Sequence, residues 1–284
     1  MNPDLNAARI GLSRGWIEFL ATFRNSQELL FGYLFFPAIF LAMALFFLDG
    51  DMDGGISVGA VHMAAGIALI IAILGVMSVA QVLATEREDG TLLRSRAVPH
   101  GMIEYTVGKI VHVLLVSLLS LTLMVIPAVL FVDGFTLAGP VALINLVWVC
   151  LLGLLALAPI GAILGALLSN PKTGVGLAML PIMAILLISG IYFPLEYIPA
   201  WLQTIAMVFP LHWIGAGLRA AAFSEELLAS GPFEAVQLPL VAGVLLLWAG
   251  LGFLLAQKVL RRMARRQSGS RVQAAQEEAM KRGY

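Results

Sequence analysis

Charged residues are scarce in this sequence. Asp, Glu, Lys and Arg make up 12% of the 284 residues, whereas hydrophobic residues make up 60%. A soluble domain carries about twice that charged fraction. Several almost uncharged runs of about 20 residues or more match the ~30 Å hydrocarbon thickness of a bilayer at a rise of about 1.5 Å per residue. The scarcity of charge therefore excludes a soluble domain and indicates an all-α protein that crosses a membrane several times.

Cysteine and the common catalytic motifs are also nearly absent. Cys150 is the single cysteine, which excludes an internal disulfide and a cysteine-based metal cluster. None of the four histidines belongs to an HExxH pair, so we predict no metal site. The sequence has no GxSxG, GxxxxGK[ST] or GxGxxG motif, so neither acyl chemistry nor nucleotide binding is indicated. We expect that the chain itself is not an enzyme and binds no cofactor.

Six apolar segments are long enough to span a bilayer. They cover residues 28–48, 56–84, 103–132, 141–169, 173–193 and 236–258. Within them Asp, Glu, Lys and Arg occur only in the end turns, so a proton relay at membrane depth is not indicated. The other polar side chains could line a translocation path or simply bond within the protein, and the candidates for the path are Ser78, Gln81, His112 and Asn145.

Small residues gather in the fourth of these segments, where Gly161 and Gly165 form the motif GAILG. Such a face lets another helix approach closely. We expect packing within the chain rather than a seam between two copies, although the motif is compatible with both.

The basic residues fall almost entirely on one side of this six-helix arrangement. Of the 17 Lys and Arg residues, all except Arg219 lie before the first span, in the second or fourth connection, at the start of the third span, or from Lys258 onward. The positive-inside rule therefore predicts that both termini are cytoplasmic.

The two ends of the chain have different characters. Residues 1–27 place apolar and basic side chains at roughly helical spacing and predict an amphipathic helix at the inner interface, with a partly ordered leader as the alternative. The first 25 residues are too polar for the core of a cleavable signal peptide, so we expect the first span to remain in the mature protein. Residues 259–284 form a basic cytoplasmic tail whose charges would contact anionic headgroups.

The connection between the fifth and sixth spans is long but largely apolar. Pro199 and Pro210 divide it into two segments of about ten to twelve residues, which is half a bilayer. We predict two short helices within residues 194–223 that dip into the outer leaflet without crossing it. The alternative is a seventh and an eighth span.

Arg219, in this connection, is the one basic residue on the outer side. We expect it to pair with an acid such as Glu196, Glu225 or Glu226, or with a lipid or substrate head group, and a plain interfacial anchor is the alternative.

The connection between the second and third spans is the longest structured cytoplasmic one. Thr85 and Glu88 have capping-box spacing, Gly90 can break the helix, and Thr91 can begin a new one. We predict a short helix over residues 86–98 with leucines at its tip that a partner could bind. A solvated turn is the alternative.

Three stretches in this order carry a family resemblance: TEREDGTLLRSRAVP, GLLALAPIGAILGALLSNP and ISGIYFPLEYIPAWLQTIAMVFPLHWIGAGLR. Together they resemble the permease subunits of ABC-2 type exporters, especially the daunorubicin-resistance type. The likeness covers most of the chain, from about Ala7 to Arg262, and implies a transmembrane domain at residues 28–258.

The resemblance implies a permease that pairs with a second permease, identical or paralogous, in the cytoplasmic membrane of a prokaryote. Two copies of a separate ATP-binding subunit would supply ATP and Mg. The resemblance also implies a coupling helix that contacts the ATPase through Glu86, Arg87, Glu88, Asp89, Gly90, Thr91, Leu92 and Leu93. The family's outer signature falls on Phe193, Pro194, Pro199, Phe209, Pro210, His212 and Arg219.

We therefore expect the membrane subunit of an ATP-driven exporter that works by alternating access and contacts lipid but no nucleic acid. Its apolar interior favours an amphiphilic or lipid-like compound or drug as cargo. Two other classes remain open at this point. An ion-coupled secondary transporter would need coupling groups or inverted repeats, and a membrane-embedded enzyme would need a polar site at depth.

Overall fold

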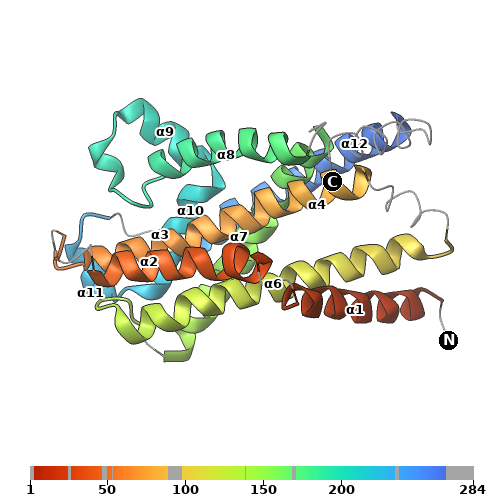
Figure 1. Ribbon diagram of the computed structural model, residues 1–284. Coiled ribbons are helices and arrows are strands. Elements are labelled where there is room, and N and C mark those ends of the chain that lie inside the picture. Colours follow the sequence, from red (N-terminus) through yellow and green to blue (C-terminus); the bar gives the residue numbers. More distant parts are fainter. Residues whose placement is uncertain are drawn as a thin grey trace.

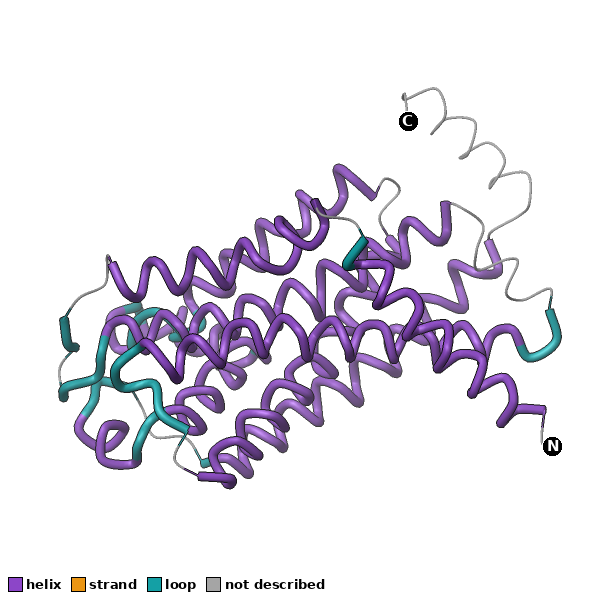
Figure 2. The backbone as a smooth tube through the Cα atoms, turned by 60° about the horizontal axis from the view of Figure 1, so that its bottom comes forward, coloured by secondary structure: helices purple, strands orange, loops and turns teal. Residues whose placement is uncertain are grey.

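The computed structural model describes residues 3–24, 27–46, 50–52, 54–88, 98–137, 139–167, 171–233 and 237–266. These residues are almost entirely helical and contain no β-strand, apart from one isolated bridge between Asp51 and Ser57. The long helices lie alongside one another in an elongated bundle (Figure 2). The all-α class predicted from composition is confirmed.

The elements follow one another with short connections. In chain order they are α1 (Pro3–Thr22), the π-helix η1 (Glu28–Leu34), α2 (Phe35–Phe46), α3 (Val58–Ala72), the π-helix η2 (Ile73–Ser78), α4 (Val79–Glu88), α6 (Gly101–Phe131), α7 (Gly139–Leu167), α8 (Pro171–Ile188), the 3-10 turn η3 (Leu195–Tyr197), α9 (Ala200–Val208), α10 (Pro210–Ala222), α11 (Glu225–Ser230) and α12 (Leu238–Arg266). Because α3, η2 and α4 follow without a gap, they form one continuous helical rod.

Four helices of the described chain are long and apolar enough to cross a membrane: Val58–Thr85, Ile103–Phe131, Gly139–Leu167 and Leu238–Leu260. They coincide with four of the six predicted spans. At the other two positions the apolar helices are shorter, Phe35–Phe46 and Met179–Ile188. A fifth crossing is reached only if the bent pair α9–α10 is counted as one span. Six crossings therefore stay a prediction.

The two ends of the bundle differ. Figure 1 places α1, the first turns of α6 and the end of α12 toward one end, and α9 and α11 toward the other. We call these the α1 end and the α9 end. The α1 end holds most of the described basic residues, among them Arg9, Arg14, Lys109, Lys258 and Arg262. The segregation of charge expected from the positive-inside rule is thus reproduced along the bundle axis.

The core lies on α3, which is buried on nearly all sides. Its residues are mostly small, so neighbouring helices approach from several directions. Gly66 illustrates this closeness, since a Cβ there would meet the side chains of Met124 and Phe40. A helix that is apolar all round belongs in the interior of a bundle.

The GAILG motif is used inside the chain. A Cβ on Gly161 would lie 2.5 Å from the backbone oxygen of Val76, and one on Gly165 would lie 2.6 Å from that of Ala80. These glycines let α7 cross η2 and α4 with the two backbones in contact. The expectation of packing within the chain is confirmed, and the motif is covered by the chain's own helices.

This crossing predicts a difference between two glycine substitutions. Gly161→Ala should destabilise the protein by about 1–3 kcal/mol, because the added methyl group meets backbone atoms that cannot move aside. Gly250→Ala on α12 has nothing within 4 Å of its added Cβ and should be neutral or stabilising by about 0.5–1 kcal/mol. The free energy of unfolding of each variant can be measured in mixed micelles. Equal values for the two variants would contradict the close contact between α7 and η2.

Candidate functional site

The α9 end is built around a turn that ends α8. Gly190 has φ +73°, a left-handed conformation that favours glycine. The turn points two backbone carbonyls at α10: His212 Nδ1 donates to Ser189 O at 2.9 Å, and Arg219 Nη1 donates to Gly190 O at 3.1 Å. Two residues of the predicted outer signature therefore satisfy the backbone where α8 stops.

The break between α9 and α10 occurs at Phe209 and Pro210, and the two helix axes differ in direction by 85°. Proline supplies no N–H and pushes the residue before it out of helical conformation. The corner is held by Trp213 Nε1, which donates to Met207 O at 2.7 Å, and by Trp248 Nε1, which donates to Val208 O at 2.8 Å. The two short helices are present as predicted, and no continuous helix runs from residue 199 to 222.

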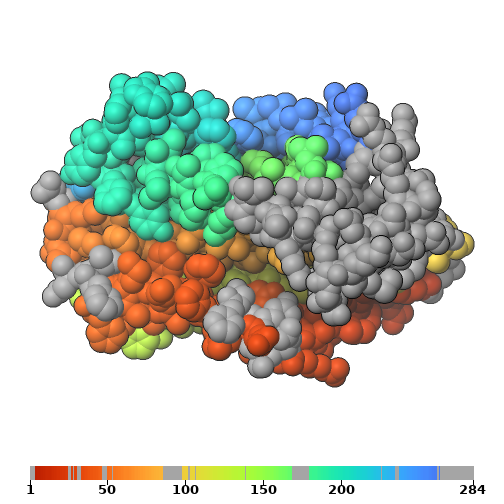
Figure 3. Space-filling view, turned by 45° about the horizontal axis from the view of Figure 1, so that its top comes forward, coloured from red at the N-terminus to blue at the C-terminus, as the bar shows by residue number. Residues whose placement is uncertain are grey.

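Helix α10 lies inside the protein. It contacts α3, α7, α8, α9 and α12, and Gly215 and Gly217 permit the approach, since Cβ atoms there would meet Ile191 and Val149. The structure shows that α10 is surrounded largely by protein rather than by lipid, and its depth in the outer leaflet stays a prediction. Figure 3 shows the surface that α8 and α9 (green to teal) contribute at this end, above that of α2 and α3 (orange).

Arg219 is buried, with 4% of its surface exposed. Besides its bond to Gly190 O, its guanidinium carbon lies 4.4 Å from the centre of the Phe233 ring, a cation–π contact. The expected pairing with Glu196 or Glu226 is not seen, because no ion pair joins Arg219 to a described carboxylate. The side chain of Glu225, the third expected partner, lies outside the described residues. A burial of 96% also rules out an exposed interfacial anchor.

The remaining signature residues frame the same turn and corner. Pro194 is buried, Phe193 is exposed, Pro199 caps α9, and Phe209 stacks on Trp248 with ring centres 6.1 Å apart. The structure thus brings the signature together as one element at the α9 end.

The predicted coupling helix lies largely outside the described residues. The backbone of Glu86, Arg87 and Glu88 continues α4, and residues 89–97 are not described, which includes Asp89, Gly90, Thr91, Leu92 and Leu93. The structure does describe the residues on either side of it, up to Glu88 and from Val98 onward. The segment joins the end of the α3–η2–α4 rod to the start of α6, at the α1 end.

Helix α1 packs along the first turns of α6, and this contact was not predicted from the sequence. Cβ atoms on Gly11 and Gly15 would collide with the backbone oxygens of Glu104 and Gly108. These two glycines form the motif GLSRG on the contact face of α1. This spacing was the available signal, because two glycines four residues apart let helices touch. The opposite face of α1 still exposes large apolar side chains, including Ile10, Trp16 and Ile17.

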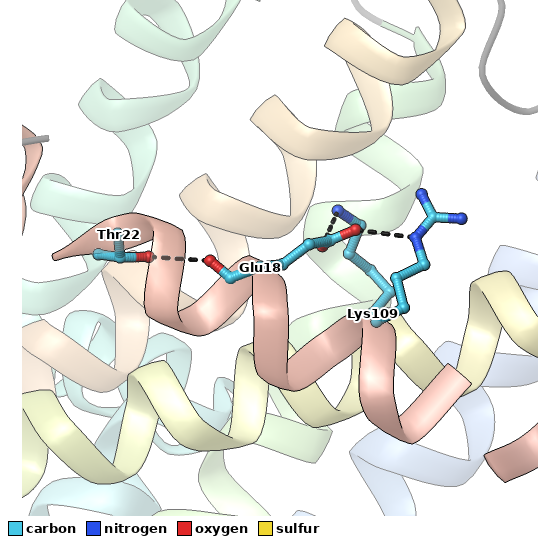
Figure 4. A network of polar contacts seen from close by, with 4 residues as sticks. Glu18, Thr22 and Lys109 are labelled. Atoms are coloured by element: carbon cyan, nitrogen blue, oxygen red, sulfur yellow. Dashed lines mark hydrogen bonds and ion pairs between the residues drawn. The ribbon is translucent and has the colours of Figure 1, made fainter. Parts of the chain in front are cut away.

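An ion cluster closes the contact between α1 and α6. Glu18 accepts from Arg14 Nε at 3.0 Å and from Lys109 Nζ at 3.1 Å, and Thr22 lies one turn further along α1 (Figure 4). Burial raises the pKa of Glu18, but the hydrogen bonds and charges of Arg14 and Lys109 outweigh it, so the pKa lies below its ordinary value of 4.5. Nearer the coupling segment, His100 Nδ1 lies 2.8 Å from Asp4 Oδ1.

The four path candidates lie on three different parts of the bundle. Ser78 and Gln81 lie on the continuous rod, His112 on α6 and Asn145 on α7, and Asn145 Oδ1 accepts from Trp148 Nε1 within its own helix. Their role in a translocation path stays a prediction. Within the described part of the chain, no group of three His, Cys, Asp or Glu could hold a metal ion.

Two comparisons with known proteins bear on these ends. The family model described as "ABC-2 family transporter protein" matches residues 53–258. This range includes the predicted coupling segment, residues 86–98, and the signature element, residues 193–219. The chain is also similar to the linearmycin resistance permease protein LnrN of Bacillus subtilis (strain 168), with 24% identity over 214 residues. That alignment covers 75% of this chain and 53% of LnrN, so the chain spans about half the length of this relative.

The ion cluster predicts that Glu18→Gln loosens α1. The substitution removes the negative charge that Arg14 and Lys109 share. The partly exposed pairs are worth about 0.5–1 kcal/mol, so hydrogen exchange of the α1 amides, read by mass spectrometry, should speed up about two- to fivefold. Glu226→Gln, at an exposed position on α11, is the control.

The same contact should depend on pH. Because the folded-state pKa of Glu18 is depressed, its contribution is present above about pH 4.5 and is lost as the pH falls through the lowered value. Wild-type exchange in α1, corrected for the intrinsic rate, should then approach that of the Gln variant. Identical α1 exchange rates in the wild type and the Gln variant at neutral pH would contradict the stabilising role of the ion cluster.

Proposed function

Because this chain belongs to the ABC-2 family of transporter proteins, we propose that it is the permease of an ATP-driven exporter that moves an amphiphilic compound out of the cytoplasm. The observation that carries the proposal is the family match over residues 53–258, in a chain whose long helices are apolar enough to span a membrane. Members of this family are transmembrane components of ABC transporters and are not themselves catalytic.

The energy source in this proposal is a separate ATPase. The sequence has no nucleotide-binding motif, so ATP and Mg would be bound by two copies of an ATP-binding subunit. As the family resemblance implies, we propose that a second permease, identical or paralogous, completes the pathway. The apolar interior and a relative named for resistance to linearmycin support an amphiphilic compound as cargo.

The path of the force follows from the connectivity. The connection between Glu88 and Pro99 joins two rods, α3–η2–α4 and α6. At about 1.5 Å per residue, the 31 residues of α6 extend about 46 Å, more than the ~30 Å hydrocarbon layer. The first turns of α6 would extend beyond the hydrocarbon layer into the headgroup region, where α1 and its ion cluster hold them. A push on the coupling segment would therefore tilt both rods together.

The orientation in this proposal has the α1 end in the cytoplasm. The described basic residues at that end support it. The exposed apolar side chains of α1 would then face the inner leaflet of a prokaryotic cytoplasmic membrane. The element formed by α9, α10 and α11 would lie at the outer side.

The coupling role predicts that Leu92→Asp or Leu93→Asp uncouples transport from ATP hydrolysis. A carboxylate at the tip of the segment would be desolvated in the groove of the partner, which costs about 1–3 kcal/mol or more. Transport by the reconstituted complex should fall at least about tenfold, with expression and membrane insertion intact. Ser95→Asp places the same charge nearby without removing a leucine and is the control. Unchanged transport in both leucine variants would refute the coupling role.

The orientation is tested by cysteine accessibility in sealed cells. The native Cys150 is buried and contributes little background. Cysteines that replace Asp51, Asp133 or Glu226 should react with an impermeant thiol reagent added outside, since these residues are exposed at the α9 end. A cysteine that replaces Ser95 should react only after the cells are opened. Labelling of Ser95→Cys from outside would invert the orientation.

A further inference from the structure

A small cavity at the α9 end contains the buried guanidinium of Arg219. Its polar lining consists of Glu196, Gln203, His212 and Arg219, with Leu195 and Phe233 as apolar walls. The cavity measures about 30 Å³, room for about two water-sized groups, and it opens to the exterior. These residues come from η3, α9, α10 and the segment before α12, so the cavity exists only in the folded signature element.

Arg219 has more donors than the described protein uses. A guanidinium carries five N–H groups and stays protonated, whereas one hydrogen bond, to Gly190 O, is formed. A buried charge is expensive unless it is paired. The Phe233 ring and one carbonyl satisfy part of this requirement, and Arg219 also lines the cavity. A bound anion would complete the coordination of Arg219.

Glu196 lines the same cavity and yet forms no ion pair with Arg219 within 4.0 Å. Its side chain is exposed, whereas Arg219 and His212 are 4% and 5% exposed. The cavity therefore has a positive charge at depth and a negative charge at its rim. A ligand with an anionic group and an adjacent cationic group would match both, because each of its charges would meet the opposite one.

We propose that this cavity binds the head group of a zwitterionic amphiphile, with its phosphate or carboxylate on Arg219 and its ammonium group at Glu196. Gln203 is placed to offer its amide to the same head group, although its Nε2 now donates to Ile198 O at 2.9 Å. The placement of the cavity at the outer side rests on the proposed function. There the ligand would be an outer-leaflet lipid or the cargo at the moment of release.

Specificity in this site comes from the rim carboxylate. A head group with net negative charge would meet repulsion from Glu196, and an inorganic anion would leave Glu196 without a partner. Phosphatidylethanolamine should therefore bind more tightly than phosphatidylglycerol, and inorganic phosphate more weakly than either.

The test is a binding experiment on the full chain, delipidated in a neutral detergent. Short-chain phosphatidylethanolamine, short-chain phosphatidylglycerol and inorganic phosphate are titrated separately, and binding is followed by thermal shift. Arg219→Gln should weaken phosphatidylethanolamine binding about tenfold or more, the loss expected for a hydrogen-bonded charge. Arg262→Gln, which removes an exposed arginine at the α1 end, should bind as the wild type does.

Glu196→Gln supplies a second test that does not depend on the stability of the Arg219 variant. Without the rim charge, the preference for phosphatidylethanolamine over phosphatidylglycerol should disappear. Unchanged preference in this variant, unchanged binding in Arg219→Gln, or equal binding of inorganic phosphate and phosphatidylethanolamine would each overturn the proposal.

A carboxylate of the chain itself is the remaining alternative. Glu234 follows Phe233 in the sequence, so Glu234→Gln is titrated alongside. If only this variant binds phosphatidylethanolamine and the wild type does not, the anion is internal and the proposal fails. Because the assay needs neither an ATPase nor transport, binding without export would refute the proposed function and leave the site standing.

Discussion

The architecture depends on one constraint: inside a bilayer, every backbone N–H and C=O must find a partner within the protein. The rods of α3–η2–α4, α6, α7 and α12 meet it through their own helical bonds. The constraint is harder to satisfy in the turn that follows α8, because its carbonyls lie outside any helix. Here His212 and Arg219 supply donors from α10 to Ser189 O and Gly190 O. The first role of these two buried side chains is therefore structural, because they satisfy backbone carbonyls of the turn.

The same constraint explains why glycine marks the tightest crossings. Helices in an apolar solvent gain no hydrophobic energy by associating, so they rely on close van der Waals contact. Gly161 and Gly165 bring α7 onto η2 and α4, and Gly11 and Gly15 bring α1 onto α6. The first contact holds the rod that ends before the predicted coupling segment, and the second holds the first turns of α6, which follow that segment. In the proposed function, these contacts would let both helices move as rigid bodies.

Part of the candidate site was readable from the sequence. Pro199 and Pro210 predicted the start of α9 and the corner before α10, because proline acts locally on the backbone. The GLSRG motif could have predicted the α1 contact but did not name its partner, since Gly108 is distant in sequence. Arg219 was singled out as the one basic residue on its side, with a carboxylate or a head group as the expected partner, and it pairs with neither Glu196 nor Glu226. Its actual partners are the carbonyl of Gly190 and the ring of Phe233. Neither is charged, so the distribution of charge along the sequence could not predict them.

By itself the sequence determined the all-α class, the positions of the long apolar helices, the break at Phe209 and Pro210, and the family resemblance. These follow from composition and from local rules of length, periodicity and proline geometry. The tertiary structure decided that α10 is enclosed by protein, that α1 lies on α6, and that GAILG faces the chain's own helices. The reason is physical: lipid and the protein interior are equally apolar, so hydropathy cannot tell a helix that faces the membrane from one that its neighbours enclose.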